Sequence, residues 1–139
     1  MPYGDRRHAP IAAKDIARVI VSLLGDPSPH LSKRYILTGP ENLTLSEMAT
    51  TIGKAINQHI DYVDLPAEQW REALLHQIGL PEFLAEHLYQ VAIDHQEGIF
   101  DLQTDTVELL TGKPPQNLTE FALEHESLFV GKQAVALGL

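Results

Sequence analysis

The sequence of 139 residues contains no cysteine, which excludes disulfide bonds, thiolate metal sites and cysteine nucleophiles. Phosphate-binding loops are also missing, because the nine glycines occur singly and neither GxGxxG nor GxxxxGK[ST] is present. No serine stands in a GxSxG context, so a nucleophile elbow is absent. The sequence therefore offers no dinucleotide loop and no catalytic nucleophile of a familiar kind, and we assign it no catalytic residue.

Long apolar runs and basic residues are scarce as well. The longest run, Ile16–Leu24, is interrupted by Arg18 and Ser22, so we expect no membrane span. The opening MPYGDRRHAP lacks the apolar stretch of a signal peptide. With 10 basic and 19 acidic residues the net charge is −9, which disfavours binding to a phosphate backbone. These features predict a cytoplasmic protein without nucleic-acid or membrane partners.

Seven histidines invite a metal hypothesis, but their spacing argues against it. His87 and His95 are eight residues apart, about 12 Å along a helix, which is too far to share one ion. No HExxH motif is present. We therefore predict no metal site and interpret the histidines as surface residues or hydrogen-bonded interior residues.

Apolar periodicity and start and stop residues predict five or six helices within one domain, residues 1–139. The expected helices cover Asp15–Leu24, Leu45–Ile56, Pro66 to a stop at Gly79, Pro81 to near Gly98, Thr104–Leu110 with Thr104 as the cap and Gly112 as the stop, and Leu118 to about Leu128 with Asn117 and Glu120 as the cap. The tail, Val130–Leu139, is weakly patterned, and we expect it to dock late or to stay mobile.

The centre of the predicted fold is one βαβ unit. Tyr35–Thr38 and Ile60–Asp64 have the composition of short strands, and Thr44 with Glu47 forms a capping box at the start of the helix between them. Two strands joined by a helix should be parallel, with a right-handed crossover. The predicted class is thus α/β, with a small, mainly parallel sheet of two to three short strands covered by helices, the third strand being His8–Ile11.

Two groups of residues are candidates for ligand contact. Arg7 and His8, next to Arg6, could meet an anionic or aromatic ligand, or they could form a solvated loop. Trp70 and Tyr89 are amphipathic aromatics that could line a pocket, or they could belong to the core or an interface.

Three motifs together resemble a known family. They are the helix start Asp15-Ile16-Ala17, Tyr35–Pro40 as Y-x-L-T-G-P, and Leu110–Pro115 as L-T-G-K-P-P. From Tyr3 to Phe129 the chain resembles the C-terminal half of NmrA-like proteins. These are atypical short-chain dehydrogenases/reductases that include NAD(P)H:quinone-type oxidoreductases and triphenylmethane-dye reductases.

The resemblance implies the C-terminal, substrate-binding part of an NAD(P)-binding Rossmann-type protein. The dinucleotide-binding half is expected to be absent here, so NAD(P) is implied for the intact protein but not for this chain alone. In such proteins the loop before the Asp15 helix and the turns after the strands face the cleft between the two parts. Arg7, His8, Thr38 and Pro66 are therefore candidates for the pocket edge.

Three functions follow as hypotheses. The first is the substrate-binding domain of an oxidoreductase that transfers hydride to a quinone-like or aromatic acceptor, inactive alone. The second is an NAD(P) redox sensor of the NmrA type that acts through protein partners. The third is a free-standing interaction module. Apolar surface left by the missing half should drive at least dimerisation, and a small aromatic molecule is the ligand expected.

Overall fold

The computed structural model describes residues 1–130. The expectation for the tail concerns residues outside this range, apart from Val130, which ends the last helix. Within the described residues the α-helices are α1 (Ala13–Gly25), α2 (Leu45–Ala55), α3 (Ala67–Glu72), α4 (Glu82–Gln96), α5 (Thr106–Thr111), α6 (Leu118–Glu124) and α7 (Glu126–Val130). A π-helical turn, Ala73–Gln77, continues α3, and a 3-10 turn, Ser28–His30, follows α1.

Two helix starts lie where the sequence predicts them, at Thr44 and Asn117. The Thr44 hydroxyl accepts from the Glu47 amide while the Glu47 carboxylate accepts from the Thr44 amide, so both halves of the capping box form. Asn117 and Glu120 make the same exchange at the start of α6. These bonds satisfy amides that the first helical turn leaves unpaired.

Two helix predictions need correction. Thr104 does not cap α5, because its hydroxyl donates to the Ile36 carbonyl, and Asp105 occupies the N-cap position. The helix expected over Leu118–Leu128 is interrupted at His125, which divides it into α6 and α7. The predicted number of helices is therefore too low.

The predicted parallel βαβ unit is wrong. Neither Tyr35–Thr38 nor Ile60–Asp64 forms a strand in the described part of the chain. The sheet consists instead of β1 (Arg7–His8) and β2 (Leu43–Thr44), which pair antiparallel with Arg7 opposite Thr44. Only the third predicted strand, at His8–Ile11, overlaps an observed one. A strand needs a partner backbone, and both apolar segments are instead held through side chains.

Side-chain bonds to distant backbone replace the expected ladders. The Thr104 amide donates to the Thr38 hydroxyl at 2.9 Å, which ties the first segment to the loop before α5. In the second segment the Tyr62 hydroxyl donates to the Met1 carbonyl at 2.6 Å and accepts from the Tyr3 amide at 3.1 Å. Both segments therefore have fixed positions without belonging to a sheet.

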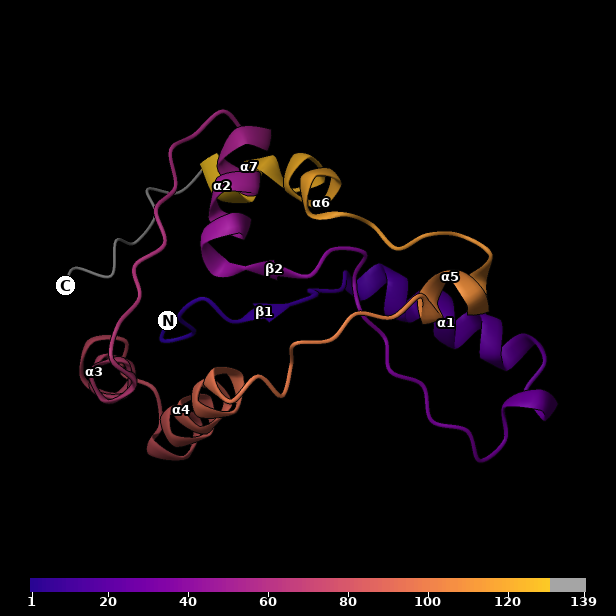
Figure 1. Cartoon of the computed structure of the whole chain (residues 1–139), viewed down its shortest axis with the longest axis horizontal. Helices are drawn as coiled ribbons and strands as arrows, with labels where there is room; N and C mark the ends of the chain where they lie inside the picture. Colours follow the sequence, from indigo (N-terminus) through magenta and orange to yellow (C-terminus); the bar gives the residue numbers. More distant parts are fainter. Residues whose placement is uncertain (131–139) are drawn as a thin grey trace.

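The helices pack in pairs around the two-stranded ribbon. Figure 1 shows β1 and β2 in the middle, α1 beside α5 at one end, α2 beside α6 on one side and α3 beside α4 on the other. The buried apolar side chains are mostly small: Val19, Met48, Ile56, Ala67, Ala73, Leu74, Ala85, Ala92, Val107 and Ala122. Half of these buried residues are alanines, and such small side chains let helix backbones approach closely.

One apolar face of α1 stays uncovered. The predicted amphipathic helix is present, but Val19 is buried whereas Ile20, Val21 and Leu24 are 51%, 70% and 73% exposed. Together with exposed Ala17 they recur at the spacing of one helical stripe. We call these four residues the apolar face of α1. Helix α5 covers the opposite side, where Val19 and Asp15 lie.

Candidate functional site

A pocket of about 350 Å³ lies between the start of the chain, residues 36–38, helix α4 and the loop after α4. Its lining is mainly apolar and aromatic: Tyr3, His8, Ala9, Ile36, Leu37, Thr38, Val91, His95, Phe100 and Leu102. None of these side chains is a lysine, an arginine or a carboxylate. Pockets of roughly 300–1,000 Å³ with such walls hold small, mainly apolar ligands.

Four rings from separate parts of the chain meet in this pocket, and we call them the aromatic cluster. Tyr3 stacks on His95 with ring centroids 3.9 Å apart and planes 10° apart. The His8 ring stands perpendicular to His95 at 4.7 Å, and Phe100 is tilted against it at 5.6 Å. Such offset and edge-on contacts fix the ring planes. The cluster therefore gives the pocket rigid aromatic walls.

The two histidines of the aromatic cluster are hydrogen-bonded to each other. Their Nδ1 (His8) and Nε2 (His95) atoms are 3.0 Å apart. Burial lowers the pKa of His8, and the neighbouring His95 lowers it further. Burial also lowers the pKa of His95, which is only 4% exposed. Because both pKa values lie below the usual histidine value of about 6.5, the pair is neutral near pH 7.

His95 departs from the expectation for an interior histidine. Its Nδ1 atom is buried and has no hydrogen-bond partner among the described residues. Buried polar atoms are normally paired, so such an atom points to function or to a local cost. His95 is also one of the residues that line the pocket.

Thr38 and Gly39 secure the wall of the pocket opposite α4. The buried Thr38 hydroxyl contacts both the amide and the carbonyl of Thr104, at 2.9 and 3.2 Å. The Gly39 amide donates to the Ala9 carbonyl at 3.1 Å. A Cβ at Gly39 would lie 1.9 Å from the Pro10 carbonyl oxygen, so only glycine permits this approach.

Of the six residues singled out from the sequence, the structure brings two into this pocket, His8 and Thr38. Arg7 is directed elsewhere, because its guanidinium donates to the Asn42 carbonyl at 2.8 Å and to Glu47 at 2.7 Å. It thereby ties β1 to the start of α2.

The other three candidates lie on or beside α3 and α4, outside the lining of this pocket. Pro66 is the N-cap of α3, and Trp70 is half-buried on the same helix. Tyr89, on α4, donates from its hydroxyl to Glu68 at 3.4 Å. Their use in ligand binding stays a prediction.

Sequence reasoning missed Tyr3, His95 and Phe100. The spacing argument for a metal site compares His95 only with His87 on its own helix, whereas its hydrogen-bond partner His8 is 87 residues away in the sequence. No spacing rule relates such positions. The only available signal was that an aromatic residue precedes the Arg7–His8 segment.

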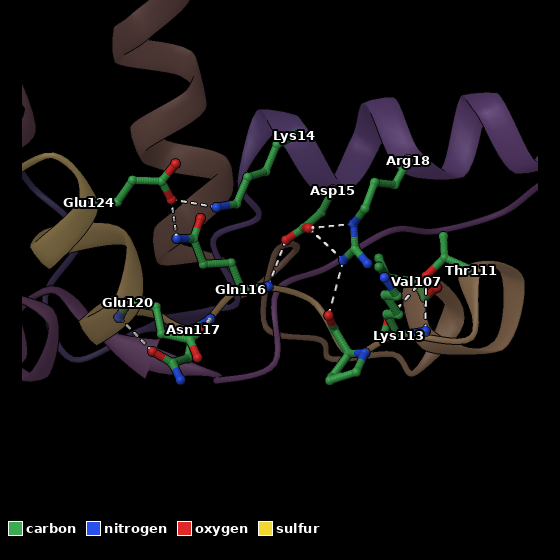
Figure 2. A network of polar contacts seen from close by, with 11 residues as sticks. Lys14, Asp15, Arg18, Val107, Thr111, Lys113, Gln116, Asn117, Glu120 and Glu124 are labelled. Atoms are coloured by element: carbon green, nitrogen blue, oxygen red, sulfur yellow. Dashed lines mark hydrogen bonds and ion pairs between the residues drawn. The ribbon is translucent and has the colours of Figure 1, made fainter.

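A second polar network, shown in Figure 2, joins α1 to the segment before α6. Asp15 is 1% exposed, and its carboxylate accepts from Arg18 at 2.6 and 3.0 Å and from the Gln116 amide at 2.7 Å. Lys14 and Gln116 both reach Glu124. The network brings the surroundings of two sequence motifs together, because Arg18, one residue after Asp15-Ile16-Ala17, donates to the Pro114 carbonyl of L-T-G-K-P-P at 3.0 Å.

Among residues 1–130, no group of three or more histidine, aspartate or glutamate side chains is arranged to hold a metal ion. None of the helices in that range has the length and apolar character to cross a membrane.

Comparison with known proteins identifies the class of the fold. A solved NADPH-dependent quinone oxidoreductase from Escherichia coli superimposes with a TM-score of 0.78 and 26% identity, over 92% of this chain and 45% of that one. A triphenylmethane reductase from Citrobacter sp. shares the fold, with a TM-score of 0.76 and 18% identity, over 89% of this chain and 42% of that one. These neighbours are α/β proteins of the NAD(P)-binding type.

A curated relative leads to the same conclusion. The NAD(P)H azoreductase of Xenophilus azovorans is 35% identical over 133 residues, which are 93% of this chain and 44% of the relative. No protein-family model matches the chain. The relatives and structural neighbours are NmrA-like NAD(P)H-dependent oxidoreductases, and this chain is similar to their C-terminal half, as the sequence motifs predicted. It spans less than half the length of the curated relatives that it matches.

Proposed function

We propose that this chain forms the acceptor-binding side of an NAD(P)H-dependent oxidoreductase, which in the intact protein transfers hydride to a quinone-like or aromatic acceptor. The pocket walled by the aromatic cluster supports this proposal most directly. Its walls are flat, its lining is uncharged and its volume of about 350 Å³ suits a compact ring system. Relatives named for quinone and triphenylmethane acceptors add independent support.

The residues of the pocket do not fit a dinucleotide. A diphosphate needs backbone amides at a glycine-rich turn or cationic side chains, and the lining of this pocket offers neither. We therefore assign this chain the tasks of binding and orienting the acceptor, with the cofactor held by the other half of the intact protein. The isolated chain should be inactive.

The residues of this chain would contribute to the reaction by orienting the acceptor. The ring planes of Tyr3 and Phe100 limit how a flat molecule can enter, and Val91 with Leu102 excludes water from its edge. Holding a reactant in one orientation lowers the entropic part of the barrier. The hydride itself comes from the reduced nicotinamide supplied elsewhere.

A chimera tests this proposal. This chain would replace the matching C-terminal part of the E. coli quinone oxidoreductase, and NADPH oxidation would be followed with a quinone acceptor. Quinone-dependent turnover, absent when the chain is omitted, is the expected result. A folded chimera that binds NADPH without turnover would contradict it and would favour a redox sensor. Micromolar NADPH binding by the chain alone would contradict the division of labour.

We also propose that the isolated chain associates into at least a dimer through the apolar face of α1. Ile20, Val21 and Leu24 are more than half exposed on this one stripe, and contiguous exposed apolar surface promotes association. Light scattering over a range of concentrations should show a dimer that Leu24→Glu dissociates. Phe83→Glu, at an apolar residue of α4 that is 76% exposed, is the matched control and should not dissociate it. A wild-type monomer at high concentration would contradict the proposal.

A cytoplasmic location and a single domain over residues 1–139 stay predictions of the sequence.

A further inference from the structure

We propose that His8 recognises the acceptor by donating a hydrogen bond from Nε2 to its carbonyl oxygen, and that His95 is the positioning residue that keeps His8 in the donating tautomer. This inference rests on the proposed function of the pocket and adds the residue that selects the ligand.

The tautomer follows from which atoms have partners. The short contact between His8 Nδ1 and His95 Nε2 allows either ring to donate. If His8 donated, the proton of neutral His95 would sit on Nδ1, which is buried and unpaired among the described residues. The His95 backbone lies near enough to raise the pKa of the ring but offers Nδ1 no bond of acceptable geometry. An unpaired buried N–H is the costlier arrangement. His95 Nε2 therefore donates to His8 Nδ1.

This assignment leaves the proton of His8 on Nε2. The Nδ1 atom of His8 is hydrogen-bonded to His95, and no group within residues 1–130 forms a hydrogen bond with the Nε2 atom of His8. His8 is half-buried and lines the pocket. Because burial and His95 keep the pKa of His8 low, the ring presents a neutral N–H at pH 7.

The surrounding rings restrict which molecules can use this donor. The stacked Tyr3 and His95 rings hold His8 perpendicular to them, so its N–H has a fixed direction. Thr38 is the other polar lining residue of that wall, and its hydroxyl is already bonded to Thr104. The ligand class that fits is a flat, uncharged ring with a carbonyl acceptor, and an apolar ring of the same size should bind less well.

The test uses the 139-residue chain with duroquinone as the probe, a fully substituted quinone. Binding is followed by ¹⁵N spectra of the histidine rings and by titration. In the free chain His8 should carry its proton on Nε2, and duroquinone should shift that signal. His30 is the matched control: its Nδ1 atom is likewise hydrogen-bonded to another ring side chain, the Tyr35 hydroxyl at 2.7 Å, but outside this pocket. Its signal should not move.

Variants separate the hydrogen bond from the packing. His8→Leu should weaken duroquinone binding about three- to tenfold, the worth of one net hydrogen bond. His8→Gln retains an N–H at similar reach and should recover binding to within about twofold of the wild type. His30→Gln changes a histidine outside this pocket and should leave binding within about twofold of the wild type.

The outcomes distinguish the two proposals. No binding of duroquinone by the wild type up to its solubility would overturn the acceptor pocket itself. Unchanged binding by a folded His8→Leu variant, or an equal loss in His30→Gln, would overturn only the role of His8. If His8→Leu does not fold, the wild-type spectra decide, because a His8 proton on Nδ1 in the bound state contradicts the assignment.

Discussion

Replacing Asp15 with alanine should destabilise the chain by about 3 kcal/mol. The carboxylate is 1% exposed and accepts three hydrogen bonds, two from Arg18 and one from the Gln116 amide. Breaking a buried ion pair typically costs 3–5 kcal/mol. The Arg18 side chain is 33% exposed and can be rehydrated, so the lower end of that range applies. For a chain of this length the loss corresponds to a fall in Tm of roughly 10 °C.

Thermal and urea unfolding, followed by circular dichroism, would measure this change. The matched control is Lys14→Met on the same helix, since the Lys14–Glu124 ion pair is about half exposed on both sides. Exposed pairs contribute about 1 kcal/mol or less. If Asp15→Ala cost no more than Lys14→Met, the view that Asp15 anchors the segment before α6 would be wrong.

Two further predictions concern stability, one for a glycine substitution and one for pH. Gly39→Ala would place a Cβ 1.9 Å from the Pro10 carbonyl oxygen and should cost about 1–3 kcal/mol or more in urea unfolding, whereas Gly25→Ala meets nothing within 4 Å and should be neutral or slightly stabilising. The lowered pKa values of His8 and His95 should make the free energy of unfolding decrease as the pH falls, since the unfolded chain takes up protons first. This contribution is complete above about pH 6.5 and is lost as the pH falls through the folded-state pKa values, so unfolding at about pH 7.5 and 5.5 checks it.

Each of these expectations can fail. A Gly39→Ala variant as stable as Gly25→Ala would contradict the close approach of the two loops. For the histidines, the variant His8→Gln/His95→Gln should flatten the pH dependence between these two values. An unchanged slope in that variant would assign the pH dependence to other groups.

Most features that depend on residues within one helical turn could be predicted from the sequence, the cap expected at Thr104 being an exception. Thr44 with Glu47, and Asn117 with Glu120, form their capping boxes because the partners are three residues apart and need no other part of the chain. Gly79 and Gly112 follow helical segments with positive φ angles of 75° and 69°, as expected for helix stops. The family motifs were equally readable, although the contact between their neighbourhoods, Arg18 bonded to the Pro114 carbonyl, was not.

The sheet and the pocket depended on tertiary contacts. Tyr35–Thr38 has the composition of a strand, but pairing requires a neighbouring backbone, and here Thr38 bonds to Thr104 instead. Alternation of apolar residues describes a segment and does not specify its partner. For the same reason two of the predicted strands and their parallel arrangement were wrong.

The sequence by itself determined most of the helices, the capping boxes at Thr44 and Asn117 and the resemblance to NmrA-like proteins, because these signals are local or are carried by short motifs. Only the tertiary structure decided that His8 meets His95, 87 residues away in the sequence. The same structure stacks His95 on Tyr3, so that these rings together form one wall of a pocket. It also decided that one stripe of α1 stays uncovered. The physical reason is the same in both cases: burial and pairing are properties of two surfaces, and a sequence pattern describes only one of them.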